Sequence, residues 1–232
     1  MADKLRSSGK SLFDFGPLAP LYEDWYATPE GKAHDIVQQR DVNTMIQPAR
    51  GPQRLLDVGC GTGHWSRFFS SLGYDVEGID ISEEMVGAAQ LNAGACSFDI
   101  GNACDLPYPD ASFDITASIT ALEFIPDQAA AVKEMARCTK PGGTMLIGTL
   151  NRTAPINIIR LEKGEEPFAS AILLGPDELL ELLLPMGEVR MTASNVDDRV
   201  SDPVIVAAHS LPLPQEHLAG PLLVARARTH SL

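Results

Sequence analysis

Three glycines at alternate positions mark the segment of the chain best suited to hold a ligand. They lie in Asp57-Val-Gly-Cys-Gly-Thr-Gly63, at the end of the short apolar run 55–58. Glycine adopts backbone conformations that other residues avoid, and it lets a ligand lie against bare main chain. Position 64 is histidine, so the spacing is not the G-x-G-x-x-G of a dinucleotide-binding loop. The segment therefore predicts a ligand-binding turn for something other than a dinucleotide, although a turn that binds nothing has the same composition.

Polar residues also stand at the end of, or just after, the next two segments that are expected to be strands. Asp80 ends the run 74–80 about 20 residues after the glycines, where a carboxylate can accept hydrogen bonds from both hydroxyls of a ribose. Ile81 would then lie beside a nucleobase. Asn102 could bind an adenine edge and the Ala103 N–H a ring nitrogen, but an asparagine after a strand is also a common turn former. These residues favour a nucleoside-containing ligand.

Alternating strand and helix patterns must position these residues. Strands are expected at 55–58, 74–80, 96–100, 113–119, 144–150, 188–194 and 220–227. Helices are expected between them, at about 64–72, from Ser82, from Asp127 and from Pro176, and two short helices lie between 21 and 45. Such alternation predicts a parallel sheet with helices on both faces. Ligands of such sheets bind at the carboxyl ends of the strands, where these polar residues lie.

Length and composition limit the possible functions. The 232 residues, 44% of them hydrophobic and 21% charged, are typical of one or two globular domains. The net charge of −13 argues against nucleic acid as a partner, because phosphate backbones need clustered lysine and arginine. No apolar stretch approaches the roughly 20 residues of a membrane span, and the first ten residues lack the apolar region of a secretory signal. The four cysteines have no metal-ligand spacing, so no metal site is expected, and scattered thiols suggest the cytoplasm.

Taken together, these features resemble class I S-adenosylmethionine (SAM)-dependent methyltransferases, and most closely the type 11 group that includes ubiquinone and menaquinone biosynthesis enzymes. The resemblance continues in the segment 106–114 and in Lys140-Pro-Gly-Gly143, and it covers roughly residues 54–151. It implies SAM as the cofactor. It also implies a Rossmann-like α/β fold, with a seven-stranded, mainly parallel sheet, helices on both faces and the last strand antiparallel.

The resemblance also implies roles for individual residues. Gly59, Cys60, Gly61 and Gly63 would hold the methionine part of SAM, and Asp57 would orient it. Asp80 and Ile81 would bind the ribose and base, and Asn102 and Ala103 the adenine. The family often has Asp where Asn102 stands. Ile119 and Thr120 would border the sulfonium.

The flanking segments are expected to bind the acceptor. Residues 1–50 would form an N-terminal arm and lid helices, and residues 51–232 the SAM-binding domain, with 198–219 as a substrate-side insertion. Tyr22 would touch the cofactor as part of the lid. The expected substrate residues are Trp25, Tyr26, Glu123, Phe124, Asn151 and Arg152.

The expected function is methyl transfer to a small apolar or aromatic molecule. Because the sulfonium methyl is already activated, alignment matters most and a general base is optional. Candidate bases are Glu123, Tyr22 and, more remotely, His34. The main alternative is a non-catalytic SAM-binding module, because a fold does not guarantee a reaction. Arsenite methylation by the cysteines and NAD-dependent oxidoreduction are weaker alternatives. The acceptor and the oligomeric state stay open.

Overall fold

The structure, a computed structural model, describes residues 10–194, 204–208, 213 and 217–230. The strands are β1 (Arg54–Val58), β2 (Asp75–Asp80), β3 (Ser97–Ile100), β4 (Phe113–Ile119), β5 (Thr139–Leu150), β6 (Gly187–Ser194), β7 (Val206–Ala208) and β8 (Leu222–Thr229). The α-helices are α2 (Ala19–Ala27), α3 (Pro29–Met45), α4 (His64–Ser71), α5 (Glu83–Leu91), α6 (Gln128–Cys138), α7 (Pro155–Lys163) and α8 (Pro176–Leu183). Short 3-10 helices are η1 (Gly16–Leu18), η2 (Leu122–Phe124), η3 (Phe168–Ser170) and η4 (Leu184–Met186).

The strands form one sheet in the order β3-β2-β1-β4-β5-β8-β6-β7. The pairs from β3 to β5 are parallel, whereas β8 runs antiparallel to both β5 and β6. The expected Rossmann-like α/β fold with an antiparallel last strand is therefore confirmed. The described residues contain eight strands where seven were expected, because β7 adds to the edge at β6. Because β7 has only three residues, it is too short to show the alternation of apolar and polar residues that marks a strand in the sequence.

The order of the strands reverses between β1 and β4. From β1 the chain moves outward to β2 and β3, and then returns to place β4 on the other side of β1. In open α/β sheets a crevice forms at this point, outside the carboxyl ends of the two strands. The glycine segment follows β1 and the segment 120–127 follows β4, so both enter this crevice.

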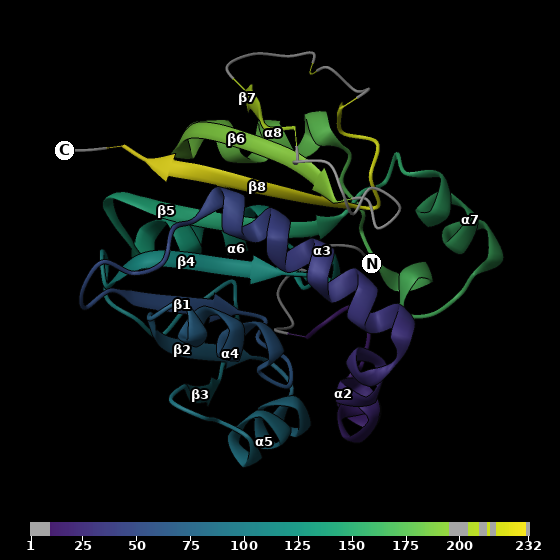
Figure 1. Cartoon of the computed structure of the whole chain (residues 1–232), viewed down its shortest axis with the longest axis horizontal. Helices are drawn as coiled ribbons and strands as arrows, with labels where there is room; N and C mark the ends of the chain where they lie inside the picture. Colours follow the sequence, from purple (N-terminus) through teal and green to yellow (C-terminus); the bar gives the residue numbers. More distant parts are fainter. Residues whose placement is uncertain (1–9, 195–203, 209–212, 214–216, 231–232) are drawn as a thin grey trace.

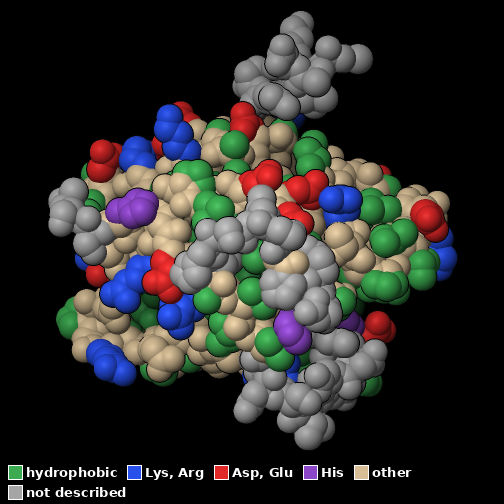
Figure 2. All heavy atoms as spheres, turned by 90° about the horizontal axis from the view of Figure 1, so that it is seen from above, with side chains coloured by type: hydrophobic (Ala, Val, Ile, Leu, Met, Phe, Trp, Pro, Cys, Tyr) green, Lys and Arg blue, Asp and Glu red, His purple; other side chains and the backbone are tan. Residues whose placement is uncertain are grey.

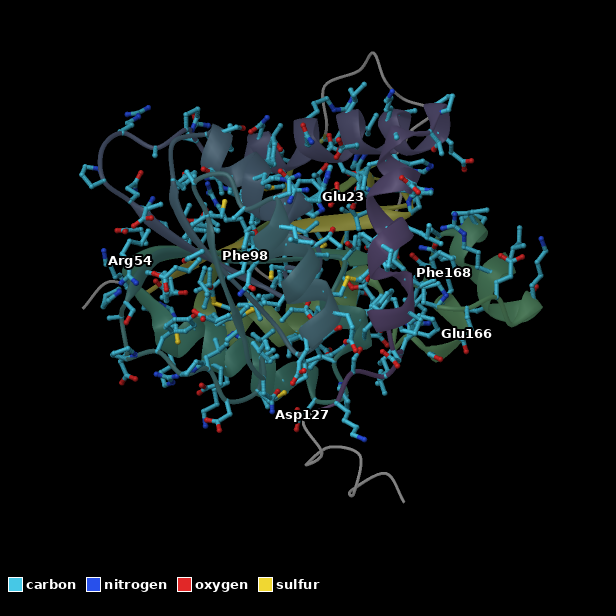
Figure 3. The ribbon with its side chains drawn as sticks, turned by 90° about the horizontal axis from the view of Figure 1, so that it is seen from below. Glu23, Arg54, Phe98, Asp127, Glu166 and Phe168 are labelled. Carbon is cyan, nitrogen blue, oxygen red and sulfur yellow. The ribbon has the colours of Figure 1, made fainter. Side chains whose placement is uncertain are left out.

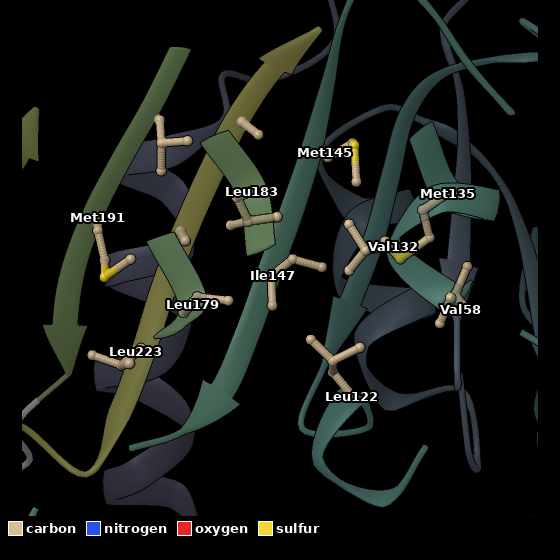
Figure 4. Close-up of a cluster of buried hydrophobic side chains, with 14 of the residues drawn as sticks. Val58, Leu122, Val132, Met135, Met145, Ile147, Leu179, Leu183, Met191 and Leu223 are labelled. Carbon is tan, nitrogen blue, oxygen red and sulfur yellow. The ribbon is translucent and has the colours of Figure 1, made fainter. Parts of the chain in front are cut away.

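Helices cover both faces of the sheet (Figure 1). One apolar cluster joins the sheet to α6 and α8, and Figure 4 shows Val132 and Met135 of α6 and Leu179 and Leu183 of α8 against strand residues such as Ile147. A second cluster joins the other face to α3, α4 and α5. Together they bury the sheet on both sides. In β4, six of the seven residues are accordingly buried, the polar Thr116 and Ser118 among them.

Helix starts follow the local sequence signals. Ser82 accepts a hydrogen bond from the Met85 N–H at 3.3 Å and begins α5, and Asp127 accepts one from the Ala130 N–H at 3.0 Å and begins α6. Such side chains satisfy backbone N–H groups that the first turn leaves unpaired. Thr28 does the same for α3 and separates it from α2, as the Thr-Pro pair predicts. These caps fix how the helices leave the carboxyl ends of the strands.

Helix α7 is the main element that the sequence analysis did not predict. It carries three isoleucines, Ile156, Ile158 and Ile159, each more than 40% exposed. Figure 2 shows hydrophobic side chains gathered at the end of the molecule where Figure 1 places α7.

Within the described part of the chain, no helix has the length and apolar character that crossing a membrane requires.

Candidate functional site

The glycine segment makes a tight turn between β1 and α4. The N–H groups of Gly59 and Cys60 both donate to the Ile79 carbonyl, at 2.8 and 3.1 Å, which ties the turn to β2. Gly59, Gly61 and Gly63 have φ angles of +76°, +52° and +83°, in the left-handed region that glycine adopts without strain.

The two glycines at 59 and 61 serve different purposes. A Cβ added at Gly59 would lie 2.4 Å from the Cβ of Ala121, so glycine is required where the segments after β1 and β4 meet. A Cβ added at Gly61 would meet nothing within 4 Å. The main chain at Gly61 therefore borders open space.

Asp80 joins the turn to the end of β2. Its Oδ2 accepts a hydrogen bond from the Gly61 N–H at 2.9 Å, and its Oδ1 accepts one from the Ser82 N–H at 3.0 Å. Burial raises the pKa of this carboxyl, although the donated hydrogen bonds oppose the shift. The carboxylate thus holds two backbone segments together, and each of its oxygens has further acceptor capacity for a ligand.

A cavity of about 670 Å³ opens beside this turn at the carboxyl ends of the strands. Of the residues expected to bind cofactor or substrate, those that line it are Tyr22, Gly59, Gly61, Asp80, Ile81, Asn102, Ala103, Thr120 and Phe124. They come from α2 and from the segments after four different strands. The fold therefore brings together residues that are up to about 100 positions apart in the sequence.

A smaller pocket of about 30 Å³ lies next to the cavity and contains four more of the expected residues, Tyr26, Asp57, Cys60 and Ile119. Asp57 is buried there, and its Oδ2 accepts a hydrogen bond from Ser66 Oγ at 2.6 Å. Burial raises its pKa to about 7, although the bond from Ser66 favours the ionised form. The ring of Tyr26 stacks on His64, with the ring centres 3.6 Å apart.

Glu123 and Asn151, both expected to face the substrate, are buried outside the cavity lining. Glu123 accepts hydrogen bonds from Thr149 Oγ1 at 3.0 Å and from the Leu150 N–H at 3.4 Å, and burial raises its pKa to about 7. Asn151 Nδ2 donates to the carbonyls of Leu218 and Gly220, at 2.8 Å each. Both side chains thus hold backbone near the end of β5.

Three other expected residues also lie outside the lining of both pockets. Arg152 forms an ion pair with Glu178 at 3.0 Å, and Trp25 is 44% exposed. Gly63 lies against Phe98, whose Cζ would be 2.7 Å from an added Cβ.

Much of the expected insertion 198–219 lies outside the described residues. Of its apolar residues, Pro203 and Leu211 are not described. Val204 and Ile205 are exposed, and Leu213 is buried in the core. Neither pocket includes them.

The N-terminal arm contributes cavity residues that the sequence analysis missed. Lys10, Ser11, Phe13, Asp14 and Phe15 all line the cavity. The Leu12 N–H donates to the Phe124 carbonyl at 2.9 Å, and the rings of Phe15 and Phe124 meet edge to face with their centres 4.8 Å apart. Phe13 and Phe15 were the sequence signal for this contact, because aromatic side chains in an otherwise polar N-terminal segment are expected to pack against another surface.

Tyr22 extends this aromatic wall from α2. Its ring lies edge to face with Phe15, with centres 6.4 Å apart. Burial, together with the nearby carboxylates of Glu123 and Asp80, raises the pKa of its hydroxyl to about 12. Tyr22 is therefore protonated at neutral pH.

Among the described residues, no group of three or more metal-ligating side chains lies close enough together to hold an ion.

The fold and the cavity define a Rossmann-like α/β protein with a small-ligand site at its switch point. Residues 56–147 match the family model described as "Methyltransferase domain". A ubiquinone biosynthesis O-methyltransferase of Xanthomonas axonopodis is 30% identical over 191 residues, which are 78% of this chain and 74% of that protein. The chain belongs to this family, the SAM-dependent methyltransferases, and SAM is its expected cofactor.

Other relatives agree with this assignment. Ajmaline N-methyltransferase of Rauvolfia serpentina is 40% identical over 108 residues, 43% of this chain and 37% of that protein. Three of the most similar curated relatives are matched over only 37%, 64% and 45% of their lengths. The crystal structure of a possible histamine N-methyltransferase from Thermotoga maritima has the same fold, with a TM-score of 0.69 and 22% identity over 92% of this chain and 97% of that one.

The residues present fit SAM. The cavity volume of about 670 Å³ lies in the range of roughly 300–1,000 Å³ that small-ligand sites occupy. The open space at Gly61 leaves bare main chain for the amino-acid end of the cofactor, and the Asp80 carboxylate at the cavity wall suits hydroxyl donors such as those of a ribose. Asn102 is partly engaged, because its Oδ1 accepts a hydrogen bond from the Cys104 N–H at 3.0 Å. Its amide nitrogen would be the group left to donate to an adenine edge.

Proposed function

We propose that this chain transfers a methyl group from SAM to a small apolar or aromatic molecule by in-line displacement. The observation that carries the proposal is the aromatic wall formed by Phe13, Phe15, Tyr22 and Phe124 around the cavity. Such rings bind flat apolar molecules through large contact areas and prefer edge-to-face packing. Thr120, the residue expected to border the sulfonium, lines the same cavity.

The side chains of the site favour positioning over proton transfer. SAM, when bound, supplies a methyl group that is already activated by the positively charged sulfur. The turn 59–63 and Asp80 would hold the cofactor, and the aromatic wall would orient the acceptor and exclude water. The high pKa of Tyr22 and the burial of Glu123 make both poor bases for the acceptor, which supports a mechanism without an obligatory general base.

The names of two relatives support a small-molecule acceptor without fixing its methylated atom. One is an N-methyltransferase named for ajmaline, and the other an O-methyltransferase of ubiquinone biosynthesis. Both nitrogen and oxygen acceptors therefore fall within the function proposed for this chain. The cytoplasm is the proposed location, since all four cysteines are free and such thiols suit a reducing compartment.

The division of the chain into two parts is also a proposal. Residues 1–50 would act as arm and lid and residues 51–232 as the SAM-binding domain. Support for the lid comes from the arm and from Tyr22, which line the cavity. The end of α3, in contrast, is part of the sheet's core through Val42 and Met45, so movement would be confined to the segment before it.

Calorimetry and a methylation screen test the proposed function. The purified chain should bind SAM and S-adenosylhomocysteine (SAH) with micromolar dissociation constants. It should also transfer label from methyl-labelled SAM to at least one member of a panel of phenols, aromatic amines and apolar amines. Failure to bind either ligand would refute the proposal. Binding of both without product across the panel would favour the non-catalytic SAM-binding module.

A further inference from the structure

The carboxylate of Glu23 reaches from α2 to the glycine turn. Its Oε1 accepts hydrogen bonds from Thr62 Oγ1 at 2.5 Å and from Arg67 Nη2 at 2.8 Å. Arg67 also donates from Nη1 to the Thr62 carbonyl at 2.8 Å, so the hydroxyl and the carbonyl of Thr62 are both held. Figure 3 labels Glu23 where the N-terminal helices approach the segment around α4.

Glu23 does not belong to the lining of either pocket. Burial by itself would raise the pKa of this carboxyl, but hydrogen bonds from His64, Thr62 and Arg67 lower it to about 2. Glu23 is therefore a carboxylate at neutral pH, and its negative charge is matched by Arg67.

A second contact joins the N-terminal helices to the other side of the turn. His64, the first residue of α4, lies 2.8 Å from Asp35 Oδ1 of α3 through its Nε2. The ring of Tyr26 from α2 stacks on the same imidazole, with an angle of 9° between the planes. Thr62 in the turn and His64 directly after it are thus both held by side chains that lie about 30 to 40 positions earlier in the chain.

The turn has one backbone hydrogen bond of its own, from the Gly63 N–H to the Cys60 carbonyl at 2.9 Å, so outside contacts must supply much of its restraint. Glycine has more backbone freedom than any other residue, and this turn has three glycines in five positions. An added Cβ at Gly61 would meet nothing within 4 Å, so packing does not hold that residue. The contacts that restrain it are the hydrogen bond from its N–H to Asp80 and a long one from Cys60 Sγ to its carbonyl, at 3.8 Å, together with its attachment to Cys60 and Thr62.

We infer that Glu23 is a positioning residue, which fixes the turn 61–63 through Thr62 and Arg67 and so preorganises the cofactor site without touching the cofactor. The identity of that cofactor as SAM rests on the proposed function. The fixing of the turn does not, because it is a property of the ligand-free chain. Preorganisation raises affinity, since the ordering of the turn then no longer opposes binding.

Hydrogen–deuterium exchange of the ligand-free protein tests this inference. In Glu23→Ala, the amides of residues 59–67 should exchange about tenfold faster than in wild type, because local opening becomes easier. Glu23→Gln should be intermediate, since its amide oxygen can still accept from Thr62 but carries no charge for Arg67. Asp24→Asn is the matched control, because Asp24 is the exposed neighbour on the same helix, and its exchange should equal that of wild type.

The pattern of exchange separates positioning from general stability. Unchanged exchange at 59–67 in Glu23→Ala would overturn the inference, and so would an equal acceleration in β4 and α6, which would indicate a loss of global stability. Calorimetry should show SAH binding weakened about tenfold in Glu23→Ala and unchanged in Asp24→Asn. If wild type does not bind SAH, the proposed function fails, while the exchange data still decide the role of Glu23.

Discussion

Replacement of Asp80 by asparagine is the most direct perturbation of the cavity. The carboxylate accepts hydrogen bonds from two backbone N–H groups, those of Gly61 and Ser82, and lines the cavity. An asparagine keeps one acceptor oxygen, but its NH2 group must face either one of these N–H donors or the ligand. A hydrogen bond to a charged acceptor contributes about 1.5–3 kcal/mol. At about 1.4 kcal/mol per factor of ten, the Kd for SAH should rise roughly 10- to 100-fold.

Calorimetric titration with SAH measures this change. Asp99→Asn is the matched control, because Asp99 is an exposed carboxylate on the neighbouring strand β3, paired with Ile79. The pH dependence provides a second measurement. Because the pKa of Asp80 is raised, wild type should lose SAH affinity as the pH falls through that pKa, at a higher pH than for an ordinary aspartate. The affinity of Asp80→Asn should not show this loss. A Kd within about threefold of wild type at neutral pH would refute the assigned role.

Two further predictions concern stability. Gly59→Ala should destabilise the chain by several kcal/mol, because the new Cβ would lie 2.4 Å from Ala121, whereas Gly61→Ala should cost only the roughly 1–2 kcal/mol of a left-handed alanine. Equal denaturant midpoints for the two variants would contradict this difference. For His64, burial lowers the pKa, but the carboxylates of Asp35 and Glu23 outweigh burial and raise it above its ordinary value. The resulting stabilisation is complete below about pH 6.5, the unfolded pKa, and is lost as the pH rises through the folded pKa. The stability difference between wild type and His64→Asn should therefore shrink with rising pH. A difference that stays constant from pH 6 to 9 would be evidence against this ion pair.

The sequence predicted the parts of the fold that local patterns encode. The segment 113–119, rich in residues that favour strands, is the strand β4 with the same bounds, and the capping residues Ser82 and Asp127 begin α5 and α6. The glycines and Asp80 were placed at the ends of strands, and in parallel strands these ends meet at one edge of the sheet. Chain order and strand direction were therefore enough to predict that these residues lie together.

Some elements gave no such local signal. The strand β7 has three residues, too few to show an alternating pattern. The strand β5 begins at Thr139, five residues before the expected start at 144, and so includes the segment 140–143. Pairing with neighbouring strands determines both. The helix α7 was not predicted either, and its isoleucines are exposed while its buried residue is Asn157, so apolar character does not mark the face that packs.

Tertiary structure alone decided which side chains face the cavity. Glu123 lies four residues after the end of β4 and contributes no atom to the cavity wall, because its carboxylate is buried against Thr149, whereas Phe124, one residue later, lines the cavity. Phe15 meets Phe124 across more than 100 residues, and Glu23 meets Thr62 across 39. The sequence determined the elements, because hydrogen bonding and apolar spacing within an element are local. The packing of those elements determined the contacts of the site, because partners so far apart in the chain leave no pattern in either segment alone.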